Sequence, residues 1–439
     1  MDRRQFTGRL ATAAVGAALT GRGPFVQTTT PLLATLDAAR LNAHLKALSA
    51  FGANRAGGVS RVAYSDFDKA GRTYVMGLMR DAGLDVSVDY AGNMLGRRAG
   101  TDAALKPIMF GSHVDSVPDG GNYDGTVGSL SAIEAAQSMK EQGIRTRHPI
   151  EVVVWANEEG GLYGSKPVSG QLKPEELQNK SWSGKTIADG MRFLGGDPSR
   201  FTEARRQRGD IAAYIELHIE QGGTLERESL NIGVVEGIVG IRRWEVTVTG
   251  MQNHAGTTPM DQRHDAMLAA ARFIDMVNRV VRAEPGRQVG TVGRLEAFPG
   301  APNVIPGRVT CTLEMRDLDT AKIVRIFDGI VRESKTVGEA NGTTFGFVPT
   351  HEDVPALSDP AIRSVISDAA KELKLTTKVM PSGAGHDAQA MAQIGPMGMI
   401  FIPSIGGISH SPKEYSTPED IERGARVLMG AVLLADKRA

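Results

Sequence analysis

Five side chains of the types that commonly ligate metal ions are spread along this chain: His113, Asp124, Glu159, His218 and His410. A two-metal hydrolytic site needs one carboxylate that bridges the ions, nitrogen and oxygen ligands on each ion, and a free carboxylate that handles protons. Glu158, directly before Glu159 in VVVWANEEGG, is a candidate for the free carboxylate. These residue types therefore indicate a dinuclear metal centre that hydrolyses its substrate.

Each of these residues also has an ordinary interpretation. Asp124, in GGNYDGTVG, could cap the helix predicted over 126–143 instead of bridging two ions. Glu158 and Glu159 could form a solvated acidic turn, although two adjacent carboxylates in an apolar setting raise one pKa unless cations compensate. His218 follows an apolar strand, where a histidine is often part of the core.

Other polar residues are candidates for orienting the metal ligands, stabilising the reacting group or binding the substrate. Asp115 follows His113 by two residues and could orient it or another ligand. His254, in MQNHAGTTPM, could stabilise an oxyanion, or it could be a loop histidine without a role. Asn303 and Arg316 could hold a substrate carboxylate, for which arginine offers a bidentate fork. His386, in PSGAGHDAQA, follows glycines that could form an anion-binding turn.

Strands alternate with helices along most of the chain, which indicates an α/β layer fold with parallel pairing. The apolar strand predicted at 107–112 leads to His113, and the strand at 150–156 leads to Glu158 and Glu159. Catalytic groups in such folds lie beyond the carboxyl ends of the strands. The predicted elements thus bring these residues to one edge of the sheet.

A second unit is predicted between 240 and 350, where the order of elements is β-α-β-β-α-β, the ferredoxin-like pattern. We expect it to be inserted in the first domain, which would comprise 31–239 and 351–439. His410 belongs to the second of these parts.

Composition narrows the classes of partner. The chain has 439 residues, of which 41% are hydrophobic, and its 50 acidic and 50 basic side chains cancel. A nucleic-acid partner is not expected without a basic patch, so a small molecule is favoured. The single cysteine, Cys311, excludes an intrachain disulfide and a Cys-x-x-Cys site. Nitrogen and oxygen ligands suit Zn, Mn, Co or Ni alike.

The N-terminus resembles a twin-arginine export signal, which we place at 1–30. Arg3 and Arg4 precede the apolar run LATAAVGAAL, which is too short to span a bilayer. Export to the periplasm is therefore expected, and a disordered tail on a cytoplasmic protein is the alternative. No other segment has transmembrane length, so no membrane anchor is expected.

Together the motifs resemble the M20 metallopeptidase-like amidohydrolases, over roughly residues 36–437. The strings are GSHVDSVPDGGNYDG, NEEG, ELHIEQG, HAGTTPM, PNVIPG, GAGHDA and ISHSPKEY. The branch they resemble contains N-carbamoyl-L-amino-acid hydrolases, allantoate amidohydrolases and β-ureidopropionases. This branch carries a histidine at the position of His218, where the peptidase relatives usually carry a carboxylate.

The resemblance implies a role for each matching position. It implies His113 and His218 on one metal, Glu159 and His410 on the other, and Asp124 as the bridge. It further implies that Glu158 is the general base and that Asp115 orients His113. His254 is implied to stabilise the transition state by reaching across a homodimer. Four positions are implied to contact the substrate: Gln221, Asn303, Arg316 and His386.

The implied fold is an M20-type zinc-hydrolase catalytic domain with an inserted ferredoxin-like lid and dimerisation domain. The implied reaction is metal-dependent hydrolysis of linear amides, foremost N-carbamoyl-L-amino acids. Allantoate, β-ureido acids and N-acyl amino acids or peptides are alternatives, and an exported two-lobed solute-binding protein is a remote one. The sequence departs from the family pattern at Gly161-Leu162-Tyr163 and at Glu314, so these departures bear on the substrate.

Overall fold

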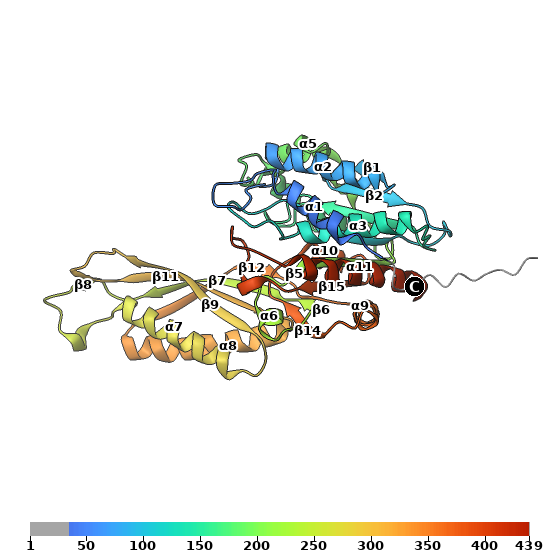
Figure 1. Cartoon of the computed structure of the whole chain (residues 1–439). Coiled ribbons are helices and arrows are strands. Elements are labelled where there is room, and N and C mark those ends of the chain that lie inside the picture. Colours follow the sequence, from blue (N-terminus) through green and yellow to red (C-terminus); the bar gives the residue numbers. More distant parts are fainter. Residues whose placement is uncertain (1–34, 439) are drawn as a thin grey trace, which may run out of the picture. The chain divides into compact units, whose positions relative to one another are not determined.

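The computed structural model describes residues 35–438, so the predicted export signal at 1–30 lies outside the described residues. A nine-stranded sheet forms its larger layer, with the strands in the order β1-β2-β4-β3-β5-β15-β6-β13 and β14 paired with β6 (Figure 1). The strands are β1 (Asp85–Val88), β2 (Met94–Arg98), β3 (Ile108–His113), β4 (Ile150–Trp155), β5 (Ala213–Ile219), β6 (Ile232–Ile238), β13 (Ala356–Leu357), β14 (Thr377–Ser382) and β15 (Met397–Ile402).

The centre of this sheet is parallel, as the alternation of strands and helices predicts. β4 and β5 both run parallel to β3, and β15 runs parallel to β5. The outer strands differ in part from this prediction, because β1, β2 and β13 pair antiparallel with their neighbours and β6 is antiparallel to β15 and β13 but parallel to β14. The sheet is therefore mixed, with its parallel part where the candidate ligands lie.

Both faces of the central strands are buried. On β4, Val152 and Val154 belong to one hydrophobic cluster, whereas Val153 and Trp155 belong to a second cluster on the opposite face. The first cluster includes side chains of the long helices, and the second includes those of several short ones. The long helices are α1 (Ala38–Leu48), α2 (Asp66–Asp81), α3 (Thr126–Glu141), α9 (Pro360–Glu372) and α11 (Pro418–Arg438), and the short ones include α4 (Ser165–Ser169) and α10 (Asp387–Met391).

Helix starts follow from the polar residues before them. Thr417 accepts a hydrogen bond from the main-chain N–H of Asp420 at 3.1 Å, so α11 begins with the threonine cap and Pro418 that its sequence predicts. Further short helices are α5 (Ile187–Phe193), α6 (Thr224–Arg227) and the 3₁₀ turns η1 (Pro174–Gln178), η2 (Pro198–Ala204), η3 (Met260–Gln262) and η4 (Ile405–Gly407).

A four-stranded antiparallel sheet has the order β12-β7-β11-β9. Along the chain its elements are β7 (Gly240–Thr249), α7 (Ala266–Ala283), β9 (Val289–Phe298), β11 (Arg308–Asp317), α8 (Thr320–Asn341) and β12 (Thr344–Asp353). This is the β-α-β-β-α-β order that the sequence predicts, and α7 and α8 cover the same face of the sheet (Figure 1). Cys311 is fully buried in β11. A separate ribbon pairs β8 (Asn253–His254) with β10 (Val304–Ile305).

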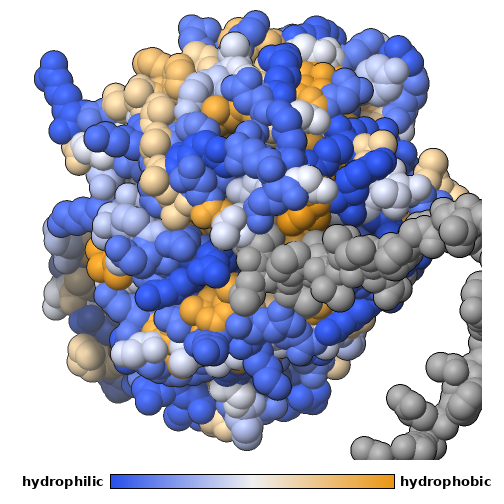
Figure 2. All heavy atoms as spheres, turned by 45° about the vertical axis from the view of Figure 1, so that its right-hand side comes forward, coloured by the Kyte–Doolittle hydropathy of each residue, from blue (hydrophilic) through white to orange (hydrophobic). Residues whose placement is uncertain are grey.

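The surface carries no broad apolar band on the face shown in Figure 2, where hydrophobic residues form small separate patches among hydrophilic ones. Within residues 35–438, none of the helices is both long enough and apolar enough to cross a membrane.

Candidate metal centre

Three neighbouring strands bring candidate ligands to one edge of the large sheet. His113 is the last residue of β3, His218 lies near the end of β5, and Glu159 follows the end of β4. These strands are parallel, so their carboxyl ends meet at the same edge. His410 reaches this edge from the loop that follows β15, the parallel neighbour of β5.

Asp124 lies between two groups of potential ligands. Its Oδ1 is 3.4 Å from Nε2 of His113 and 3.1 Å from Nε2 of His218. Its Oδ2 is 3.4 Å from Nε2 of His410, which in turn is 3.4 Å from Oε2 of Glu159. The two carboxylate oxygens therefore face different ligand sets, as a carboxylate that bridges two cations must.

Two buried histidines each have one ring nitrogen that is free to bind a cation. Nδ1 of His113 is 3.0 Å from the carbonyl oxygen of Asp115, and Nδ1 of His218 is 2.9 Å from that of Ile219. A carbonyl only accepts, so Nδ1 carries the hydrogen and Nε2 is left with a lone pair. Among residues 35–438, both Nε2 atoms and Oε1 of Glu159 are buried without a hydrogen-bond partner. The residues present fit a pair of divalent cations.

Charges within the cluster shift the pKa values of its members. Burial alone would raise the pKa of Asp124, but His218, His113 and His410 outweigh it and hold that pKa well below its usual range. The hydrogen bond with Asp124 raises the pKa of His410 to about 9, against the opposing effect of burial. Burial, followed by the charge of Asp124, raises the pKa of Glu159 to about 8. These groups bind protons at the positions where metal cations would bind.

Glu158 is buried beside the candidate ligands but outside their two groups. Its Oε2 lies 3.7 Å from Nε2 of His113. Burial raises the pKa of Glu158 well above its usual range, and the charges of Asp387 and Glu159 add to this effect. A carboxylate whose pKa is raised is a stronger proton acceptor, which suits proton exchange with a reacting group.

Asp115 fixes this part of the site through two different groups. Its main-chain carbonyl orients His113, whereas its carboxylate lies 3.7 Å from the same nitrogen. The carboxylate instead accepts hydrogen bonds from the main-chain N–H groups of Glu158, at 3.3 Å, and Glu159, at 3.2 Å. The side chain of Asp115 therefore positions the two glutamates, and its backbone positions the histidine.

Asp124 does not cap the following helix, which removes the ordinary interpretation of this residue. α3 begins after Gly125, and the described part of the chain supplies no side-chain cap there. Gly125 has φ 62°, and a Cβ at this position would lie 2.3 Å from the imidazole ring of His113. A glycine is required here because the turn passes directly over the histidine.

A cavity of about 350 Å³ opens onto the cluster. Gln221 lines it and donates a hydrogen bond from Nε2 to Oδ2 of Asp124 at 2.6 Å. Arg316 also lines it and donates from Nε to Glu314 at 2.8 Å and from Nη1 to the carbonyl of Gly383 at 2.7 Å. Members of the cavity wall also include Gly161, Leu162 and Lys166. Part of the segment that departs from the family pattern therefore faces the cavity.

His386 also lines this cavity, where it precedes α10. Its ring lies 4.5 Å from that of His218, between centroids, and its Nε2 is 2.8 Å from Oγ of Ser382. Burial lowers the pKa of His386 well below its usual range, and His218 adds to this effect. The main-chain N–H of Ala388 donates to Glu216 at 3.1 Å and that of Ala384 to Ser382 at 3.2 Å. Two donors of the predicted anion-binding turn are thus already engaged.

His254 and Asn303 lie apart from the other predicted site residues. The main-chain N–H of Ala255 donates to the carbonyl of Asn303 at 2.9 Å, beside the ribbon of β8 and β10. Nδ1 of His254 accepts from the N–H of Gly256 at 3.0 Å. Neither residue is part of the cavity wall that residues 35–438 form around the cluster.

One buried carboxylate beside the candidate metal ligands, Glu414, was not predicted from the sequence. Glu414 accepts hydrogen bonds from the main-chain N–H groups of Tyr123, Asp124 and His410, at 2.9, 3.0 and 3.3 Å, and from Oγ of Ser409 at 2.9 Å. Ser409 also donates to Oδ2 of Asp124 at 3.1 Å. The only sequence signal was its position in ISHSPKEY, four residues after His410.

The backbone near the centre adopts a conformation that side chains other than glycine rarely take. Asn157, Leu162, Gln221 and His410 have φ values of 52°, 61°, 57° and 53°. Such residues cost free energy and persist where the surrounding structure holds them, which is common at functional sites. Two of them, Gln221 and His410, contact Asp124 directly.

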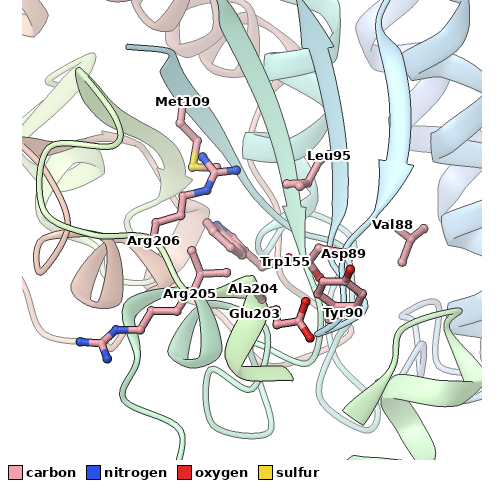
Figure 3. Close-up of a pocket in the computed structure, with 11 residues that line it drawn as sticks. Val88, Asp89, Tyr90, Leu95, Met109, Trp155, Glu203, Ala204, Arg205 and Arg206 are labelled. Atoms are coloured by element: carbon pink, nitrogen blue, oxygen red, sulfur yellow. The ribbon is translucent and has the colours of Figure 1, made fainter. Parts of the chain in front are cut away.

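A further cavity, of about 360 Å³, lies over β2 and β4 (Figure 3). Trp155, Met109 and Leu95 contribute apolar side chains to its wall, and Arg206, which also lines it, forms an ion pair with the buried Glu151. The side chain of Arg205 points away from the other labelled residues (Figure 3). None of the five candidate ligands belongs to the wall that the described residues give this cavity, so it is separate from the metal centre.

The chain is similar to known proteins over almost its full length. The model of peptidase family M20/M25/M40 matches residues 109–434. An N-carbamoyl-L-amino acid amidohydrolase from Geobacillus stearothermophilus is 40% identical over 398 residues, which cover 90% of this chain and 97% of that protein. An allantoate amidohydrolase from Escherichia coli (strain K12) is 35% identical over 387 residues, covering 87% and 94%.

Solved structures agree with the sequence relatives. A Burkholderia multivorans amidase of the hydantoinase/carbamoylase family is 38% identical and superposes with a TM-score of 0.85, covering 92% of this chain and 98% of that one. The chain therefore belongs to peptidase family M20/M25/M40, and it is an amidohydrolase of the hydantoinase/carbamoylase branch of that family.

Proposed function

We propose that this protein is a dinuclear metal-dependent hydrolase of N-carbamoyl-L-amino acids, which it converts to the amino acid, carbon dioxide and ammonia. The observation that carries the proposal is the position of Asp124, whose two oxygens face His113 with His218 and His410 with Glu159. Allantoate, a β-ureido acid, or an N-acyl amino acid or peptide would be hydrolysed by the same chemistry.

Two divalent ions would be held by these five residues, with His113 and His218 on one ion and Glu159 and His410 on the other. When bound, such ions lower the pKa of a water molecule and polarise the carbonyl group of a substrate. Zinc, manganese, cobalt and nickel all accept the nitrogen and oxygen atoms offered here.

Glu158 is the proposed general base. It takes a proton from the attacking water, whose oxygen forms a bond to the carbonyl carbon, and it returns the proton to the leaving nitrogen as the C–N bond breaks. Its burial and raised pKa support this role because a carboxylate of raised pKa is a stronger proton acceptor. Gln221, Arg316 and His386 would hold the ureido and carboxylate groups of the substrate, since all three line the cavity.

The names of the relatives support a ureido substrate. The 40% identical relative is named for N-carbamoyl-L-amino acids and the 35% identical one for allantoate, and both compounds carry a carbamoyl group. Two features of the metal-centre cavity bear on the choice between them. These are Gly161 and Leu162 in its wall, and Glu314, which holds Arg316.

The residues between 240 and 350 are proposed as a lid and dimerisation domain inserted between 31–239 and 351–439, and the enzyme as a homodimer. His254 and Asn303 support this proposal because they lie beside one ribbon and do not line the metal-centre cavity of their own chain. From this ribbon they would reach the metal-centre cavity of the partner subunit. Coexpressed His254→Ala and Glu158→Gln chains test it. Mixed dimers should recover part of the activity that each variant alone lacks, and failure to do so would exclude the shared site.

Export by the twin-arginine route is proposed from Arg3 and Arg4. Replacing both arginines with lysine should move the protein from the periplasmic to the cytoplasmic fraction. Equal periplasmic amounts of both forms would rule this route out.

The proposed activity is tested with a panel of substrates and a Glu158→Gln variant. The metal-loaded enzyme should hydrolyse N-carbamoyl-L-amino acids faster than allantoate, β-ureidopropionate, N-acetyl amino acids and dipeptides. Glu158→Gln should retain both metals, measured by elemental analysis, and lose at least about 100-fold in kcat. Full activity in the variant would contradict the role of Glu158, and a protein with neither metal nor turnover would favour a solute-binding function.

A further inference from the structure

A second cavity, of about 450 Å³, adjoins the metal-centre cavity. Gln221 and Ala384 belong to the walls of both. Gln221 is fixed between them because its N–H donates to Oγ of Ser404 at 3.0 Å and its side chain donates to Asp124. The two cavities are therefore neighbours that share part of one wall.

Three segments near the metal centre, together with Arg287 from the loop between α7 and β9, form the walls of this second cavity. The segments are the loop after β5 at 220–224, the end of β14 with the residues that follow it, and β15 at Phe401. The ring of Phe401 lies 5.9 Å from the ring of His386 and 6.5 Å from the ring of His218, between centroids. The floor of the second cavity is thus continuous with the packing around a candidate metal ligand.

The charged groups in this wall already have partners within the chain. The two oxygens of Glu220 accept hydrogen bonds from the main-chain N–H groups of Thr224, at 2.7 Å, and Leu225, at 2.8 Å. Arg287 forms an ion pair with Glu236, and Lys378 forms one with Glu228. A charged ligand group would have to compete with these bonds, so the cavity favours an uncharged one.

The rest of the wall is mainly apolar. Met380, Pro381, Ala384 and Phe401 present carbon and sulfur atoms to the cavity. The metal-centre cavity differs, because Asp124, Glu158 and Glu159 line it together with His218 and His410, whereas Glu220 is the only acidic residue in the wall that the described residues give the second cavity. The two cavities therefore suit different parts of one molecule, with the polar ureido and carboxylate groups in one and an apolar group in the other.

We propose that the second cavity receives the side chain of the substrate and selects N-carbamoyl-L-amino acids with large apolar side chains, aromatic rings included. This inference rests on the proposed function and deepens it. The volume of the second cavity is in the range of cavities that bind small molecules, so this cavity has room for a side chain larger than that of alanine. Pocket contacts of this kind commonly discriminate about 10- to 200-fold between apolar groups of different size.

The first test is a series of substrates for the metal-loaded, full-length enzyme: N-carbamoylglycine, N-carbamoyl-L-alanine, N-carbamoyl-L-methionine and N-carbamoyl-L-phenylalanine. We expect kcat/KM to rise along the series, by at least about tenfold from the glycine to the phenylalanine compound. Equal values, or a fall with size, would overturn the inference and leave the proposed function in place. Hydrolysis of none of the four compounds would overturn both.

The second test fills the cavity with Gly383→Leu. A Cβ at Gly383 would meet no described atom within 4 Å, so the added side chain has open space beside it. The ratio of kcat/KM for the phenylalanine compound to that for the glycine compound should fall at least about tenfold. Gly77→Leu is the matched control, since Gly77 also has open space around its Cβ position but lies in α2.

The ratio in Gly77→Leu should equal that of the unmodified enzyme. Thermal unfolding of both variants shows whether each is folded. If folded Gly383→Leu keeps the full preference for the phenylalanine compound, the side chain does not occupy this cavity and the inference is wrong.

Discussion

The carboxylate of Glu414 accepts a hydrogen bond from the main-chain N–H of Asp124 at 3.0 Å, although 290 residues separate them in the sequence. The same carboxylate accepts from the N–H of His410 at 3.3 Å. One buried side chain thus holds the loop of the bridging ligand and the loop of a terminal ligand together. Because ligands must be held in place before a metal can bind tightly, Glu414 is expected to set metal affinity.

Replacing Glu414 with glutamine should weaken metal binding by about 10- to 100-fold. An amide has one acceptor oxygen, whereas the four donors around Glu414 are shared between two. Titration of the metal-free protein with Zn²⁺ or Mn²⁺ by calorimetry measures the change. Glu419→Gln is the control, since Glu419 is an exposed acidic residue in the first turn of α11. Equal metal affinities in the two variants would show that Glu414 does not affect metal binding.

A methyl group at Gly125 should displace His113. The Cβ of Gly125→Ala would lie 2.3 Å from the imidazole ring, and φ 62° is itself unfavourable for alanine. We expect less than the full metal content by elemental analysis, together with a lower melting temperature. Gly77→Ala, where the new Cβ meets no described atom within 4 Å and alanine favours the helix α2, should keep the full metal content and should not lower the melting temperature. Full metal occupancy in Gly125→Ala would show that the turn tolerates a side chain.

Removal of the metals should lower the melting temperature of the protein. Without cations, the carboxylates of Asp124, Glu158 and Glu159 share a buried volume with histidines that must carry protons to offset their charge. Binding of ions to the native state alone stabilises it by mass action. Melting curves before and after dialysis against a chelator, and after addition of Zn²⁺ or Mn²⁺, measure the effect. A melting temperature unaffected by chelation and by added metal would contradict a site held by these ligands.

Asp68 should make stability depend on pH. Burial raises the pKa of Asp68 from 3.8 to about 6, against the opposing charge of Arg72. The folded state therefore favours the protonated form, so stability is lost as the pH rises from about 4 to about 6. The loss is on the order of 3 kcal/mol above pH 6, at 1.36 kcal/mol per pKa unit.

Asp68→Asn should remove this loss, because asparagine keeps the oxygen that accepts from the N–H of Tyr64 and never ionises. Its melting temperature should exceed that of the unmodified protein at pH 8 and approach it near pH 4. A variant less stable than the unmodified protein at pH 8 would instead mean that the charge of Asp68 is stabilised by Arg72.

The central strands and the ligands at their ends follow from local patterns in the sequence. The apolar run 107–112 predicts the strand that ends with His113, and the run 150–156 predicts the strand before Glu159. Regular alternation of strands and helices is enough to place such residues at one edge of a sheet.

Other features depend on contacts between distant segments. β6 pairs antiparallel with β15, which local periodicity cannot reveal. Glu414 resembles an ordinary surface acid until its contacts with Tyr123 and Asp124 are known. The sequence also left open whether Asp124 caps a helix, and this depended on where α3 begins.

The parallel pairing of β5 with β15 has a consequence for synthesis of the chain on the ribosome. His113, Asp124, Glu159 and His218 leave the ribosome long before β15 and His410 are translated. Until then β5, whose residues are all buried in the finished sheet, has one unpaired edge. A product terminated before β15 would therefore be a substrate for chaperones and proteases and not a half-active enzyme, because residues 397–410 supply both a candidate ligand and the strand that covers that edge.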